Sequence, residues 1–145
     1  MRHHLVLRVV SKLLIPFMLL FALYVQFHGD FGPGGGFQAG VIFAAAFILY
    51  ALVFGIDHAR EVLPERVLRY LVPAGLALYT LTGFAGIVLG GKYLDYDVLG
   101  STPTAGQHLG ILLVEFGVGV TVSAVMVTVF FAYAGRTRDV DEEDW

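Results

Sequence analysis

One carboxylate lies inside the long apolar stretches of this sequence, at Glu115. A charged side chain at the centre of a bilayer costs about 3 kcal/mol on insertion scales, so such a residue usually faces a bundle interior, a partner protein or water. A carboxylate in that position can carry a proton or attract a cation. The alternative is a protonated Glu115 that donates a hydrogen bond to a neighbouring helix and fixes its packing.

Further polar residues could extend this feature into an ion path. At helical spacing, Gly119 and Ser123 follow Glu115 on the same face by one and two turns, and His108 precedes it by about two turns. An imidazole and a second carboxylate follow the first apolar stretch, beside a glycine-rich segment. The candidate ion-path residues are therefore Glu115, His28, Asp30 and His108.

Redox and metal chemistry have little support in the sequence. The chain has no cysteine, which removes the thiolate ligands of zinc and iron–sulfur sites. We assign no catalytic residue, no cofactor and no metal site. One alternative is a membrane anchor in which His28 and His108 ligate haem and the bundle holds a quinone, although neither histidine lies in a paired pattern in the middle of a span.

A run of glycines follows Pro33 between two apolar stretches. Composition alone favours a plain tight turn, but a turn needs only one or two glycines. The other interpretation is a docking and ion-access surface, because glycines let another backbone approach closely. The residues assigned to this structural and docking role are Pro33, Gly34, Gly35, Gly36, Phe37 and Gly40, with Gly86 and Gly90 in a second small-residue stripe.

Composition predicts the elements that position these residues. The 145-residue chain is 57% hydrophobic and has a mean hydropathy of +0.76, which is typical of an integral membrane protein. Four stretches are long enough to cross a hydrocarbon core of about 30 Å as helices. We predict an all-α protein with spans at about 5–27, 37–56, 67–89 and 109–134, one membrane domain over 1–138 and an acidic tail over 139–145.

Charge predicts orientation and excludes some functions. Eight of the nine Lys and Arg residues fall on one side of the predicted spans, and Lys92 falls on the other. The positive-inside rule therefore places both termini in the cytoplasm and the glycine-rich segment outside. The connections are too short for a soluble catalytic domain, so no enzyme is expected, and no nucleic-acid partner is predicted.

The order of motifs resembles the MnhB (MrpB) family of small subunits of the Mrp (Mnh) multisubunit Na⁺/H⁺ antiporters. The resemblance spans nearly the whole chain, from His28-Gly29 through "PGGGF" and Gly40 to a fourth helix that opens "HLGILLVEFGVGVTV". In these antiporters the principal proton-pumping lysines and glutamates belong to the large antiporter-like subunits, so the resemblance gives Glu115 no role.

The resemblance implies a small, multi-pass subunit of a bacterial or archaeal inner membrane. Its partners would be the other antiporter subunits and the lipid bilayer, in a complex that exchanges Na⁺ for H⁺. Related ion-translocating modules occur in membrane-bound hydrogenases and complex I-like assemblies, and an equivalent subunit of such a module is the alternative function.

Overall fold

The computed structural model describes residues 5–29 and 32–136. Its elements in chain order are α1 (Leu5–Phe27), α2 (Gly36–Phe54), α3 (Ile56–Val62), α4 (Glu65–Val88), the 3-10 helix η1 (Tyr96–Leu99) and α5 (Pro103–Arg136). Four of these, α1, α2, α4 and α5, are long and apolar enough to cross a membrane. The prediction of an all-α protein with four membrane-spanning helices is confirmed.

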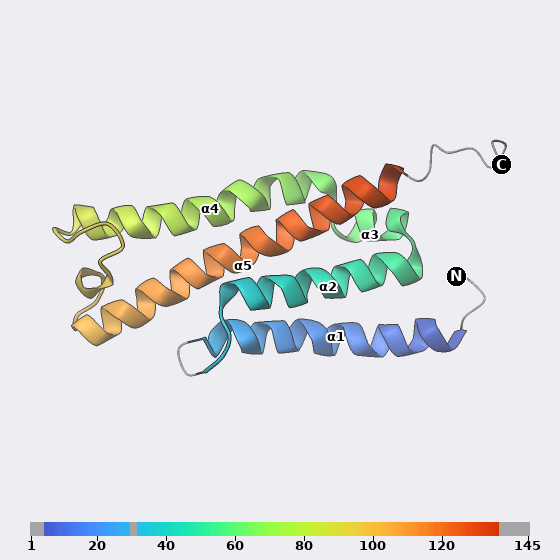
Figure 1. Cartoon of the computed structure of the whole chain (residues 1–145), viewed down its shortest axis with the longest axis horizontal. Coiled ribbons are helices and arrows are strands. Elements are labelled where there is room, and N and C mark those ends of the chain that lie inside the picture. The colour runs from blue at the N-terminus through green and yellow to red at the C-terminus, as the bar shows by residue number, and fades with distance from the viewer. Residues whose placement is uncertain (1–4, 30–31, 137–145) are drawn as a thin grey trace.

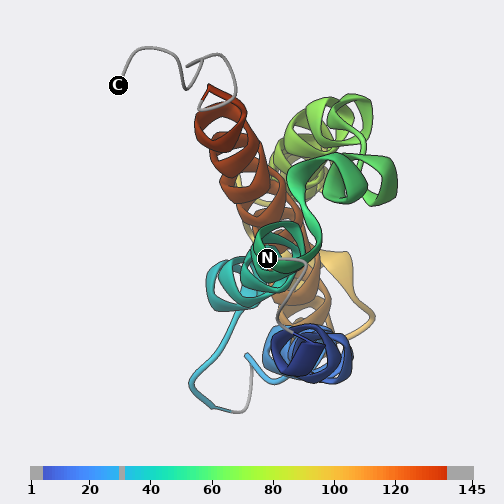
Figure 2. The ribbon, with the colours of Figure 1, turned by 90° about the vertical axis from the view of Figure 1, so that its right-hand side faces the viewer.

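The central helix of the bundle is α5. It packs along α2 and along α4, whereas α1 packs mainly on α2 (Figure 1). Seen from its end, the bundle is a row in the order α1, α2, α5, α4 (Figure 2). The start of α1 and the end of α5 lie at the same end of the bundle, as four antiparallel crossings require (Figure 1). The assignment of that end to the cytoplasm stays a prediction.

Small side chains hold the helices together. Ala44 of α2 and Ala124 of α5 are each 1% exposed and belong to one buried cluster with Val127 and Phe131. Lipid tails are as apolar as leucine, so helices in a membrane associate through close van der Waals packing rather than through the hydrophobic effect. The alanines make that close approach possible.

The ends of the helices differ most from the predicted spans at the end of the second span and at the start of the fourth. The second span, predicted at 37–56, ends at Phe54 because Gly55 has φ +105°, a conformation that other residues rarely adopt. The short polar helix α3 follows it and was not predicted. The last helix begins at Pro103, before the apolar run, because proline suits the first turn of a helix. Its 34 residues extend about 51 Å, more than a bilayer core of about 30 Å.

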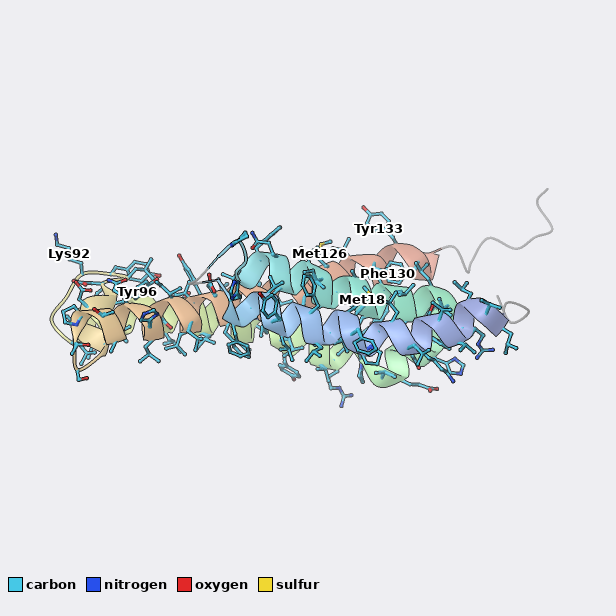
Figure 3. All side chains as sticks on the ribbon, turned by 90° about the horizontal axis from the view of Figure 1, so that it is seen from below. Met18, Lys92, Tyr96, Met126, Phe130 and Tyr133 are labelled. Atoms are coloured by element: carbon cyan, nitrogen blue, oxygen red, sulfur yellow. The ribbon has the colours of Figure 1, made fainter. Side chains whose placement is uncertain are left out.

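The segment 89–102 folds back onto the ends of α4 and α5. The Tyr96 ring fills the space where Gly110 of α5 would carry a side chain, and Tyr93 does the same at Gly83 of α4. Burial raises the pKa of the Tyr96 phenol above its usual value, and nearby tyrosines add to the effect. Lys92 and Tyr96 lie at the end of the bundle opposite Tyr133 (Figure 3).

Large apolar side chains cover the outside of the bundle. In α1 only 11% of the most apolar stretch is buried within the chain. Met126 and Tyr133 of α5 are 42% and 72% exposed and point outward (Figure 3). Such a surface suits contact with lipid or with other membrane helices, which agrees with a multi-pass membrane protein.

Candidate ion-path site

The carboxylate of Glu115 lies against the turn that joins α1 to α2. Glu115 is about 18 Å along α5 from Pro103, at about 1.5 Å per residue. A Cβ added at Gly29 would lie 2.5 Å from Glu115 Oε2, and one added at Gly35 would lie 2.9 Å from Oε1. Cβ atoms essentially never approach another atom that closely. The Glu115 carboxylate thus fills the space beside these two glycines of the turn.

The same contact brings the carboxylate of Glu115 close to the first residues of α2. Gly35 is the N-cap of that helix and has φ +124°, which favours glycine. The first N–H groups of a helix lack intrahelical acceptors, and the N-terminal end of its dipole is positive. A carboxylate beside Gly35 therefore lies where a negative charge is stabilised.

Two further glycines bring the backbones of α2 and α5 together. A Cβ at Gly36 would overlap the main-chain oxygen of Glu115, and one at Gly40 would lie 2.7 Å from the main-chain oxygen of Gly119. The glycine stripe of α2 thus docks on α5 of the same chain. This intramolecular contact is one that the sequence pattern alone could not distinguish from contact with another subunit.

The other predicted ion-path residues lie around this contact at different levels. His28 follows the end of α1, stacks on Tyr24 with ring centroids 5.0 Å apart, and lies beside Gly32. His108 is exposed and lies about 10 Å outward from Glu115 along α5, at about 1.5 Å per residue. Asp30 lies outside the described residues. The structure therefore places His28 next to the Glu115 contact and His108 two turns away from it.

The remaining motif residues have varied surroundings. Gly34 packs on the main-chain oxygen of Val25, whereas Pro33 is exposed and Phe37 is 61% exposed. Gly86 packs on the main chain of the segment 89–102. Gly90 lies beyond the end of α4, in a turn, with φ +92°. Of the two glycines of the second stripe, only Gly86 therefore lies in the helix.

Gln26 belongs to the site but is not among the residues that the sequence predicts. It lies in the last turn of α1 and is 6% exposed, with its Oε1 2.6 Å from the position of a Cβ at Gly119. Its Nε2 is buried and has no hydrogen-bond partner among the described residues. The available signal was that Gln26 is the one side-chain amide within the predicted span 5–27.

A groove of about 200 Å³ continues inward from this amide between α1, α2 and α5. Gln26, Gly119 and Ser123 line it together with apolar side chains. The helix face that carries Glu115, Gly119 and Ser123 thus faces the other helices of the bundle. Within residues 5–29 and 32–136, no group of three or more His, Cys, Asp or Glu side chains could hold a metal ion.

Comparisons with known proteins extend over almost the whole chain. A family profile described as "Domain related to MnhB subunit of Na+/H+ antiporter" matches residues 6–128. Proteins of Staphylococcus aureus strains Newman and COL, each named "Putative antiporter subunit mnhB2", are 38% identical to the chain over 133 residues. Each match covers 90% of this chain and 94% of the relative.

Proposed function

Because the chain belongs to the family of the MnhB subunit of Na⁺/H⁺ antiporters, and is thus a small subunit of a multisubunit antiporter, we propose that Glu115 forms part of the ion path of that complex. One observation carries the proposal: the carboxylate is held between the α1–α2 turn and the positive end of α2. A carboxylate in that position can exchange a proton or attract a cation.

The depth of the α1–α2 turn supports access to water. The turn meets α5 at Glu115, inside the apolar stretch that begins at Leu109. Non-helical backbone at membrane depth is tolerated only where it is buried in protein or lines a water-filled cavity. In this proposal other antiporter subunits cover the exposed Phe37, at the start of α2 beside the turn, and water reaches the turn on the side that faces Glu115.

The other candidates take secondary roles. His28 follows α1 directly before Gly29, and His108 lies outward along α5, so both line the approach to Glu115 in this proposal. Asp30 joins them on its place in the sequence alone. Na⁺ and H⁺ are the proposed ions, the cytoplasmic membrane is the proposed location, and the subunit has no enzymatic activity of its own.

The test measures Na⁺-dependent exchange across inverted membrane vesicles that contain the whole complex. Three forms are compared with wild type: Glu115→Gln, Glu115→Ala and a deletion of this subunit, with the levels of the other subunits checked in each. Glu115→Gln keeps the size of the side chain and removes its charge. Glu61→Gln, an exposed acidic residue of α3, is the matched control.

The outcomes separate transport from assembly. We expect both Glu115 variants to abolish exchange in a fully assembled complex, and Glu61→Gln to behave as wild type. Normal exchange with Glu115→Gln would show that the side chain serves packing alone. If deletion disperses the other subunits while both Glu115 variants transport normally, the subunit has an assembly role.

A further inference from the structure

A groove lies far from Glu115, where α5 ends and α4 begins. It has a volume of about 570 Å³ and lies between α3, α4 and α5. Its walls combine apolar side chains, among them Leu68, Val72 and Phe131, with two arginines at Arg60 and Arg69. A groove with this combination is amphipathic along its length.

The positively charged side chain of Arg60 lines the groove and is held by three contacts. Its guanidinium lies 5.7 Å from the ring centroid of Phe131, and its Nη2 is 3.2 Å from Glu65 Oε1. A Cβ added at Gly135 would lie 2.9 Å from the same Nη2, so the guanidinium lies against the end of α5. Its Nε is buried without a hydrogen-bond partner among the described residues.

Arg69 supplies a second, exposed positive charge at the groove. Glu65 is the only acidic side chain among the described residues that line it, and Glu65 already pairs with Arg60. Pro73, one turn further into the same wall, has no N–H, so the main-chain oxygen of Arg69 lacks its usual helical donor. At this end of the groove the Arg69 guanidinium can therefore bind an anionic group, and the Arg69 main-chain oxygen can accept a hydrogen bond from a hydroxyl group.

We propose that this groove binds one anionic phospholipid. Its phosphate contacts Arg69 at the end of the bundle, and an acyl chain lies along Val72, Pro73 and Ala132. Basic pockets between membrane helices at the interface recognise anionic headgroups in this way. A zwitterionic lipid has the same phosphate with a cationic group beside it, so its net attraction to Arg69 is weaker.

Charge and depth favour a lipid over a helix of another subunit. Arg69 lies one turn from the start of α4, and the lining residues of α5 belong to its last turns, so the charged end of the groove is at interface level. The apolar walls run from there toward the middle of the bundle. That order of charge followed by hydrocarbon is the order of groups in a phospholipid.

The test uses photoreactive lipids and the whole antiporter complex in bilayer nanodiscs. A phosphatidylglycerol with a diazirine in one acyl chain is compared with the phosphatidylcholine of the same chains. Labelled peptides of this subunit are identified by mass spectrometry. Arg69→Gln removes the proposed headgroup contact, and Arg66→Gln is the matched control, because Arg66 is exposed on the same helix and does not line the groove.

We expect phosphatidylglycerol to label the peptides of α4 and α5 that contain Val72 and Phe131. Arg69→Gln should lower that labelling about fivefold, the effect of one arginine on attraction to anionic lipid, and Arg66→Gln should leave it unchanged. Thr128→Phe, which fills the groove and keeps both charges, should also prevent labelling.

Three results would overturn the proposal. Equal labelling by the two lipids would remove the headgroup preference, and equal labelling of Arg69→Gln and wild type would remove the assigned contact. Absence of labelling in the assembled complex would show that another subunit fills the groove.

Discussion

The carboxylate of Glu115 occupies the space that a side chain at Gly29 would need, with Oε2 2.5 Å from the position of the missing Cβ. The two residues are far apart in sequence: Gly29 lies in the turn that follows α1, and Glu115 lies within α5. The Glu115 carboxylate lies beside two of the glycines in the turn between α1 and α2, Gly29 and Gly35. The glycines make room for a carboxylate at the start of α2.

Gly29→Ala should destabilise the complex because of Glu115. The three atoms nearest to the added Cβ all belong to the flexible end of the Glu115 side chain, so that side chain must change its rotamer, and we expect a cost of about 0.5–1.5 kcal/mol. In a Glu115→Ala background the space is free, and the effect of Gly29→Ala should nearly vanish. A double-mutant cycle on the melting temperature of the purified complex measures this coupling.

Gly32→Ala is the control for that cycle. Its Cβ would meet the imidazole of His28, 3.0 Å away at Nε2, and not Glu115. Its effect should therefore be the same with and without the Glu115 side chain. Equal effects of Gly29→Ala in both backgrounds would contradict the contact.

Gly36→Ala should behave differently, because its Cβ would overlap the main chain of Glu115. Removing the Glu115 side chain leaves that oxygen in place, so α2 and α5 must still separate. We expect a loss of at least about 1–3 kcal/mol that Glu115→Ala does not rescue. Melting of the same set of complexes provides the measurement, and rescue by Glu115→Ala would show that the two helices are not packed through their main chains here.

Gln26→Met tests the buried amide beside Gly119. Nε2 has no partner among the described residues, and an unpaired buried polar group costs about 1–3 kcal/mol. Methionine keeps a similar length without this cost, so the melting temperature should stay the same or rise. Gln38→Met, at an exposed position of α2, is the comparison. A marked loss of stability with Gln26→Met alone would mean that water or another subunit satisfies the amide.

The sequence predicts the four long helices well and their ends less well. Apolar runs of about 20 residues have few structural alternatives in a bilayer, because every backbone polar group must be satisfied internally. The break at Gly55 depends on a backbone conformation that many glycines do not adopt, and α3 is too short and polar to register in hydropathy. The first span, 5–27, coincides with α1 because no such break adjoins it.

The sequence predicts which residue carries the candidate site but not which residues it contacts. A lone carboxylate within an apolar run identifies Glu115 from the cost of burying a charge. Its contact with Gly29 and Gly35 joins segments that no local pattern connects. Gln26 was missed for the same reason, since an amide near a helix end is ordinary until its burial against Gly119 is known.

Arg60→Ala should destabilise the chain more than Glu65→Ala does. The ion pair is partly exposed, with side-chain exposures of 36% and 58%, so losing it through Glu65 should cost less than about 1 kcal/mol. Arg60 also packs on Gly135 and lies over the Phe131 ring, and an alanine removes both contacts. Melting of complexes with each single variant measures the difference. Equal losses would mean that the ion pair with Glu65, at the start of α4, accounts for the whole contribution of Arg60, and that the guanidinium has no stabilising contact with the aromatic ring.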